Sequence, residues 1–257
     1  MAATTSAGIT LSNDCYDRSK QVFLKEVEIL QNILQSDFVA AHHIGSTSVR
    51  DLLCKPRTDI ALELSSLQNV MLIETAGYKH RGELNIPFRH FFRKNNEEAS
   101  VNLHALEKGN PEVEGFLMFR NYLANNREAM TEYAELKKTI SAKVTIKEGQ
   151  LLAEYTLAKD GFIRGILKKA GFEGLCIRYV THYNERDYAS KYRTDDAYLE
   201  MIFYKGPRII GYSCLNENLD IVIFNIDEPQ HEEYFREKVE KLAGEKAQMR
   251  KSQTLKS

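Results

Sequence analysis

A short polar turn and one carboxylate carry the clearest chemistry in this sequence. Gly45 stands directly before Ser46, Thr47 and Ser48, and Asp59 follows thirteen residues after Ser46. A glycine lets backbone N–H groups approach an anion closely, and hydroxyl groups add further donors. A carboxylate beside such a turn is a ligand that Mg²⁺ uses in phosphoryl or nucleotidyl transfer. The pattern predicts a phosphate-binding turn formed by Gly45, Ser46 and Thr47, with Asp59 as metal ligand and catalytic group.

Further polar side chains extend this predicted site. Glu63 is expected on the same strand face as Asp59, because side chains alternate along a strand, and it is the second candidate metal ligand. His104, in the segment 100–106, is a second candidate catalytic residue. Positive charge for phosphate comes from four basic candidates: Lys55, Arg89, Arg93 and Lys94.

Each of these residues also has a purely structural interpretation. Gly45 and Ser46 could form only a turn with a helix cap. Asp59 could be paired with Lys55 or Arg57, because a buried charge without a partner is costly. His104 could pack in the core, and the basic residues of segment 88–94 could belong to a solvated strand edge. From the residues alone, both interpretations stay open.

The elements that must position these side chains are of mixed type. Apolar residues recur at three- and four-residue spacing in 16–35, which predicts an amphipathic helix. A second helix, 66–78, is expected to end at Gly77, and a third begins after Asn110, an N-cap directly before Pro111. Short apolar segments typical of strands are 38–44, 57–64, 88–94 and 100–106.

The glycine-containing stretch "KKAGFEGL" (168–175) is the predicted domain boundary. We expect a disordered N-terminus over 1–15, a first domain over 16–171, and a second domain over 172–257 that ends in a charged helix. The last stretch, 246–257, is expected to be disordered. The predicted fold class is α/β (α+β): a mixed sheet with helices, followed by a smaller α/β domain.

Composition limits the class of partner. The net charge of −1 provides no global basic field, which argues against nucleic acid as the main partner. The four cysteines lack zinc-site spacing, as expected for reduced thiols in a cytoplasmic protein. No run approaches the roughly 18 apolar residues of a membrane span. We therefore expect a cytoplasmic protein whose partner is a small molecule or another protein.

Six motifs resemble the GrpB family, also known as UPF0157, in order and approximate spacing over about residues 16–165. They are "HIGSTSV…KPRTDI", "FRHFFRK", "LHALEKGNPE", "FRNYL", "EYAELK" and "YTLAKDGFI". That family resembles a branch of the nucleotidyltransferase superfamily, whose signature is a Gly-Ser turn followed by a strand of the form Asp-x-(Asp/Glu). Gly45, Ser46 and Asp59 match this signature, and Ala61 stands where the second carboxylate would be.

The resemblance implies a nucleotidyltransferase-like mixed sheet and binding of a nucleoside triphosphate, or another phosphorylated small molecule, with Mg²⁺. It also implies nucleotidyl transfer to an unknown acceptor. The alternative function is that of a catalytically silent binding protein for an anionic metabolite or a protein partner. We carry both forward, because a shared fold alone does not establish an activity.

Residues 172–257 faintly resemble the GNAT acetyltransferases. That class binds the pyrophosphate of acetyl-CoA through a Gly-rich loop after its fourth strand. The equivalent stretch here, "NIDEPQHEEYFREKV", has no glycine and carries several carboxylates that would repel phosphate. We expect a binding or stabilising module in place of an active acetyltransferase.

Overall fold

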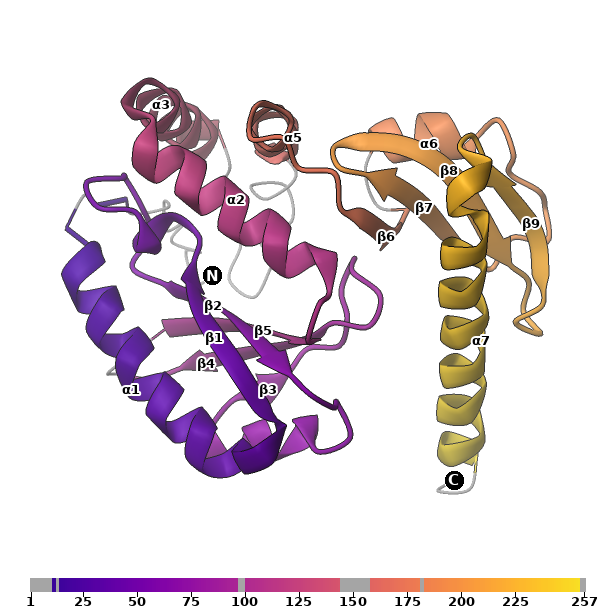
Figure 1. The fold of residues 1–257 in the computed structure, drawn as a ribbon, viewed down its shortest axis with the longest axis horizontal. Helices are drawn as coiled ribbons and strands as arrows, with labels where there is room; N and C mark the ends of the chain where they lie inside the picture. Colours follow the sequence, from indigo (N-terminus) through magenta and orange to yellow (C-terminus); the bar gives the residue numbers. More distant parts are fainter. Residues whose placement is uncertain (1–10, 13, 97–99, 144–157, 181–182, 255–257) are drawn as a thin grey trace, which may run out of the picture. The chain divides into compact units, whose positions relative to one another are not determined.

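The computed structural model describes residues 11–12, 14–96, 100–143, 158–180 and 183–254 (Figure 1). The chain divides into two compact units. The first contains Met1–Gly82 and His90–Phe172, and the second contains Glu83–Arg89 and Glu173–Ser257. The short segment Glu83–Arg89 therefore belongs to the second unit, although it lies within the first unit's stretch of sequence.

A five-stranded mixed sheet forms the centre of the first unit. Its strands β1 and β2 are antiparallel, β2 and β5 are parallel, and the pairs β5–β4 and β4–β3 are antiparallel. In sheet order, the strands are β1 (Phe38–Ile44), β2 (Thr58–Leu64), β5 (Ser100–Glu107), β4 (His90–Asn95) and β3 (Lys79–His80). The predicted mixed sheet is confirmed.

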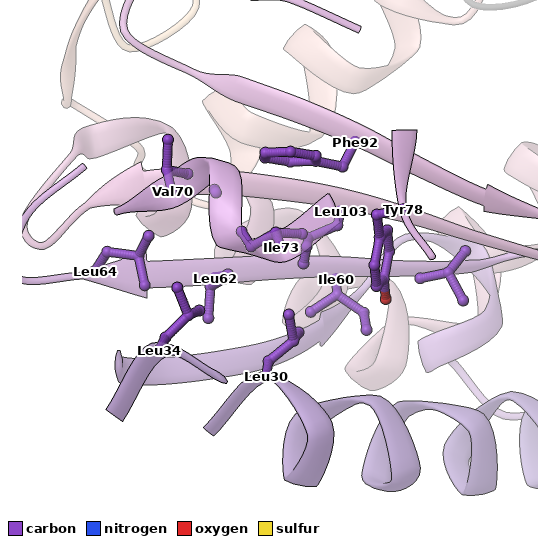
Figure 2. Packing of buried hydrophobic residues seen from close by; sticks show 12 residues of the cluster. Leu30, Leu34, Ile60, Leu62, Leu64, Val70, Ile73, Tyr78, Phe92 and Leu103 are labelled. Carbon is purple, nitrogen blue, oxygen red and sulfur yellow. The ribbon is translucent and has the colours of Figure 1, made fainter. Parts of the chain in front are cut away.

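Helix α1 (Tyr16–Leu34) covers one face of this sheet together with a 3-10 segment, η3 (Val70–Ala76). Leu30 and Leu34 of α1 pack on the inward side chains of β2, as Figure 2 shows. The twelve buried residues of this cluster are Leu30, Leu34, Ile60, Leu62, Leu64, Val70, Ile73, Tyr78, Phe92, Val101, Leu103 and Ala105. Alternation along β2 sends Asp59, Ala61 and Glu63 to the opposite face.

The helix predicted over 66–78 is wrong in type and length, because η3 is a seven-residue 3-10 segment. Asn69 precedes it without a side-chain capping hydrogen bond. The predicted stop is confirmed, since Gly77 adopts the left-handed conformation with φ of 83°.

The other face of the sheet carries α2 (Pro111–Asn125), and α3 (Arg127–Lys143) and α5 (Asp160–Lys169) pack against α2. The predicted N-cap is confirmed, because the side chain of Asn110 accepts a hydrogen bond of 3.0 Å from Glu112 N. Val113 of α2 packs on Ala61 of β2. The polar candidates on β2 and β5 therefore lie on the α2 face of the sheet.

The second unit contains a four-stranded antiparallel sheet in the order β6-β7-β8-β9. Its strands are β6 (Leu175–Tyr179), β7 (Leu199–Lys205), β8 (Arg208–Leu215) and β9 (Ile221–Ile226), and its helices are α6 (Tyr183–Ala189) and α7 (Glu232–Thr254). The mixed α and β composition expected of this unit is confirmed.

The two ends of the chain are partly described. Ser12 forms a two-bond backbone bridge with Cys54, with N···O distances of 2.8 and 2.9 Å, whereas residues 1–10 and 13 lie outside the described residues. The disorder predicted from residue 246 is wrong as far as Thr254, because α7 continues to that residue. Lys246 pairs with Glu83, and Ala247 packs against the core, so this part of the helix has tertiary support.

No helix among the described residues is both long and apolar enough to cross a lipid bilayer. All four cysteines are buried and free.

Candidate functional site

The turn after β1 lies directly against Asp59. Gly45 has a φ of 71°, and a Cβ atom placed on it would lie 2.5 Å from Asp59 Oδ2. The next residues form a single 3-10 turn, η2 (Ser46–Ser48), and Val49 then continues in extended conformation. No α-helix follows this turn, so the helix cap considered as a structural interpretation of Gly45 and Ser46 does not apply. Only glycine satisfies both the positive φ and the close approach of the carboxylate.

Two of the three hydroxyl groups in this turn are engaged in holding its shape. Thr47 is buried, its Oγ1 donates to Arg57 O at 3.2 Å, and His43 Nε2 lies 3.1 Å from the same oxygen. Ser48 Oγ donates to Gly45 O at 2.6 Å. These bonds tie η2 to β1 and to the start of β2, which supports a structural role for both hydroxyls.

Ser46 has a different partner, a buried lysine that the sequence analysis did not select. Lys137 Nζ, on α3, donates to Ser46 Oγ at 3.0 Å and also to Leu53 O. Lys137 is 2% exposed, and its Nζ lies 4.4 Å from the centroid of the Tyr133 ring. Burial lowers the pKa of Lys137 to about 7. The available signal was its place as the last residue of the motif "EYAELK".

Asp59 is held by a chain of hydrogen bonds across the sheet. Its Oδ1 accepts from Asn102 Nδ2 at 2.7 Å, and Asn102 Oδ1 accepts from Arg93 Nε at 3.3 Å. Burial raises the pKa of Asp59, while the Asn102 hydrogen bond and nearby positive charges act in the opposite direction. The carboxylate is thus oriented by β5 and β4 as well as by its own strand.

Four cationic side chains, here called the basic cluster, surround Asp59: Lys55, Arg57, Arg93 and Lys159. Burial, with repulsion from Lys159 and Arg57, lowers the pKa of Lys55 to about 8. Burial likewise lowers the pKa of Lys159 and of Arg93, and Arg57 adds repulsion at Arg93. Among the groups of the described residues that act on one another here, four cations face the carboxylate of Asp59, and a bound anion would offset this positive charge.

Lys159 comes from a distant part of the chain, at the start of α5. The local sequence pattern does not mark it as a site residue, although it lies within the motif "YTLAKDGFI". For Arg57, the sequence favours only a structural role as a partner of Asp59. Its Nε donates to Ser100 Oγ at 2.8 Å, which fixes the guanidinium beside the end of β5.

Two of the predicted basic residues are not among the four cations of the basic cluster. Lys94 follows Arg93 on β4 and therefore points to the other face of the sheet, where its Nζ donates to Glu26 Oε1 at 2.9 Å. Arg89 belongs to the second unit, and its Nη2 donates to Glu83 O at 3.0 Å. Neither residue is brought into the basic cluster.

Glu63 and His104 also have separate surroundings. Glu63 lies four residues beyond Asp59 on β2, where its carboxylate accepts from Gly109 N at 3.3 Å and lies 2.9 Å from His42 Nε2. His104 is opposite Ala61 in the sheet, with its ring in edge contact with Phe91 and Phe116. These contacts resemble packing interactions more than those of a shared metal site.

The metal ligands that the protein offers near Asp59 determine which kind of magnesium site is compatible with the structure. Within the described ranges, no group of three or more His, Cys, Asp and Glu residues is placed to hold a metal ion. A two-metal centre, which needs several anionic ligands, does not fit these residues. A single Mg²⁺ carried by phosphate groups needs only one or two protein carboxylates, and Asp59 fits that requirement.

Comparisons with known proteins give the family. The family profile described as GrpB protein matches residues 13–169, which includes the whole basic cluster. UPF0157 protein YqkA of Bacillus subtilis (strain 168) is 32% identical over 155 residues, which are 59% of this chain and 42% of YqkA. The chain therefore spans less than half the length of that relative.

UPF0157 protein BH1888 of Halalkalibacterium halodurans is 31% identical over 170 residues, 64% of this chain and 84% of the relative. The crystal structure of conserved protein GrpB from Enterococcus faecalis has a TM-score of 0.54 at 29% identity, and covers 63% of this chain and 96% of its own. With a profile match over more than half of its length, the chain belongs to the GrpB family.

Proposed function

We propose that the first unit binds a phosphorylated small molecule at the basic cluster, with a nucleoside triphosphate carrying Mg²⁺ as the leading ligand. The observation that supports this proposal is the excess of positive charge around Asp59. Burial lowers the pKa values of Lys55, Lys159 and Arg93, and repulsion from neighbouring cations lowers them further at Lys55 and Arg93. A phosphate group would remove this repulsion, because it offers several negative oxygens to the same groups.

The residues have distinct roles in this proposal. Arg57 and Arg93 present planar guanidinium groups, which suit two-point contact with phosphate, and Lys55 and Lys159 add point charges. Asp59, oriented by Asn102, is the protein ligand for a magnesium ion that arrives with the phosphates. When bound, Mg²⁺ would supply positive charge that offsets the charge of the phosphate groups.

Nucleotidyl transfer is a more specific prediction than nucleotide binding. One residue favours binding without transfer. Ala61 stands where the strand would carry its second carboxylate, and it packs against Val113 of α2. Because β2 then offers one ligand beside the turn, the site resembles a binding site more than a two-metal catalytic centre. A cytoplasmic location also stays a prediction, supported by the four free cysteines.

Calorimetric titration with the four common nucleoside triphosphates, each with and without Mg²⁺, tests the proposal. Arg93→Gln should weaken binding by about tenfold or more, because it deletes a charge-assisted hydrogen-bond donor. Lys138→Gln is the matched control, since Lys138 is exposed and pairs locally with Glu135 at 2.7 Å. It should leave binding unchanged.

The absence of binding for every nucleotide and for inorganic phosphate would overturn the proposal. Binding that is equally strong in Arg93→Gln would place the ligand elsewhere. Incubation with a nucleotide labelled at its α-phosphate then separates binding from transfer. Label that becomes covalently attached to an acceptor only with Mg²⁺ would show transfer, and its absence alongside tight binding would favour the silent binding protein.

A further inference from the structure

The two faces of the second sheet differ in chemistry. The face under α7 is apolar, with Phe203 stacked on Phe235 at 4.4 Å and with Val239 and Leu242 buried beside them. On the opposite face, alternation along β7 and β8 places Glu200, Tyr204 and Tyr212 among the buried side chains of Ile202 and Cys214. Covering a sheet face requires only apolar side chains, so the hydrogen-bonding groups on this face need another explanation.

Two carboxylates on this side of the sheet, one buried and one half-buried, accept hydrogen bonds from tyrosines. Glu185 of α6 is 0% exposed, and its Oε1 accepts from Tyr204 OH at 2.6 Å. Glu200 Oε1 accepts from Tyr212 OH at 2.9 Å. Burial and the hydrogen bond to Glu200 raise the pKa of Tyr212, so its hydroxyl stays a donor at neutral pH. The fold thus positions a carboxylate at a place where burial is costly.

A cavity of about 340 Å³ opens beside Glu200, within the size range of sites that hold small molecules. It is lined by Val180, Arg186, Ala189, Ser190, Arg193 and Glu200. The lining therefore includes two guanidinium groups and one carboxylate.

The charged side chains of the cavity are arranged for a ligand that carries both a positive and a negative charge. The side chain of Glu200 is 17% exposed, and that of Arg193 is 64% exposed. Arg193 Nη2 lies 3.4 Å from Glu200 Oε2, a long contact that leaves other donors of the same guanidinium available. An oxyanion could bind Arg193 and Arg186 near solvent, while a cationic group reached Glu200 at the more buried side.

We propose that this cavity binds a small zwitterion of free amino-acid type. Its carboxylate is recognised by Arg186 and Arg193, and its ammonium group by Glu200, which Tyr212 holds in place. This site lies wholly within the second unit and uses none of the residues of the basic cluster. The second unit is then a sensor or carrier of an amino compound, independent of the phosphate site.

Nuclear magnetic resonance titration of the full chain with the proteinogenic amino acids, one at a time, tests the proposal. At least one should bind with a Kd of about 1 mM or below, and N-acetylation of that amino acid should abolish binding. Arg193→Gln should weaken binding by about tenfold, because a charge-assisted contact is lost at a partly exposed position. Glu200→Gln should weaken binding of the amino acid but leave binding of its deaminated analogue unchanged.

Arg236→Gln is the matched control, because it removes the same charge from α7, where Arg236 pairs with Glu232 at 2.8 Å. It should bind as the parent does. Glu200→Gln could disturb the Tyr212 contact and with it the fold, so circular dichroism accompanies each variant, and Arg193→Gln serves as the variant at an exposed side chain.

Three results would overturn the proposal. The first is that no amino acid binds at about 10 mM, a weakness that excludes specific recognition. The second is binding that is unchanged in Arg193→Gln. The third is binding of inorganic phosphate or acetate alone, with no gain from an ammonium group, because that would show a plain anion site.

Discussion

Lys94 offers a sharp test of how the first unit uses its charges. Its position next to Arg93 in the sequence suggested phosphate binding, but the structure pairs it with Glu26 across the buried face of the sheet. The Nζ atom lies 2.9 and 3.1 Å from the two carboxylate oxygens, and the side chains of Lys94 and Glu26 are 11% and 3% exposed. We predict that Lys94→Met destabilises the unit without affecting nucleotide binding.

The expected loss of stability follows from the buried carboxylate that the substitution leaves without its partner. Methionine replaces the aliphatic stem of lysine, so the main loss is the partner of a buried carboxylate, for which about 3–5 kcal/mol is typical. Tyr78 OH still donates to Glu26 Oε2 at 2.9 Å, which places the expected loss at the lower end, about 3 kcal/mol. For a unit of this size, about 3 kcal/mol corresponds to a fall in Tm of roughly 6–12 °C.

Urea and thermal denaturation followed by circular dichroism measure this loss, with the nucleotide titration run on the same samples. The double variant Glu26→Gln with Lys94→Met is the control, because it removes the stranded charge and should recover part of the lost stability. A loss below about 1 kcal/mol, typical of an exposed pair, would refute the reasoning. Weakened nucleotide binding at unchanged stability would indicate that Lys94 contributes to phosphate binding.

Three further predictions concern the turn and its surroundings. Gly45→Ala should lower the free energy of unfolding in urea by about 1–3 kcal/mol more than Gly82→Ala does. Both glycines have a positive φ, but of the two only Gly45 would place a Cβ against Asp59. Equal losses of stability would contradict this contact. Because the pKa of Lys137 is lowered to about 7, the folded state binds fewer protons than the unfolded state above that pH. The free energy of unfolding should therefore rise between about pH 7 and pH 9. Lys137→Met should flatten this rise, whereas Lys138→Met should not. Asp59→Asn should abolish the gain in nucleotide affinity produced by Mg²⁺ but tighten the binding of metal-free phosphate, because it removes the negative charge that the basic cluster surrounds. A retained Mg²⁺ dependence in calorimetry would show that Asp59 is not the metal ligand.

Local patterns in the sequence were sufficient for most of the regular structure. The helix expected over 16–35 is α1, and the segments expected as strands became β1, β2, β4 and β5 with small shifts at their ends. These elements depend on hydrophobic periodicity and on capping residues such as Asn110 and Gly77, which act within a few residues of themselves. The family motifs in turn identified Gly45, Ser46 and Asp59 as neighbours.

Only the tertiary structure decided which charges meet. Arg93 and Lys94 are adjacent in the sequence but lie on opposite faces, because the pairing of β4 with β5 sets Arg93 beside Asn102 and Lys94 beside the buried Glu26. Lys137 reaches Ser46, and Lys159 acts on Asp59, from positions about a hundred residues further along the chain. Electrostatic contacts of this kind depend on distance in space and on burial, and neither is encoded in the local pattern around a residue.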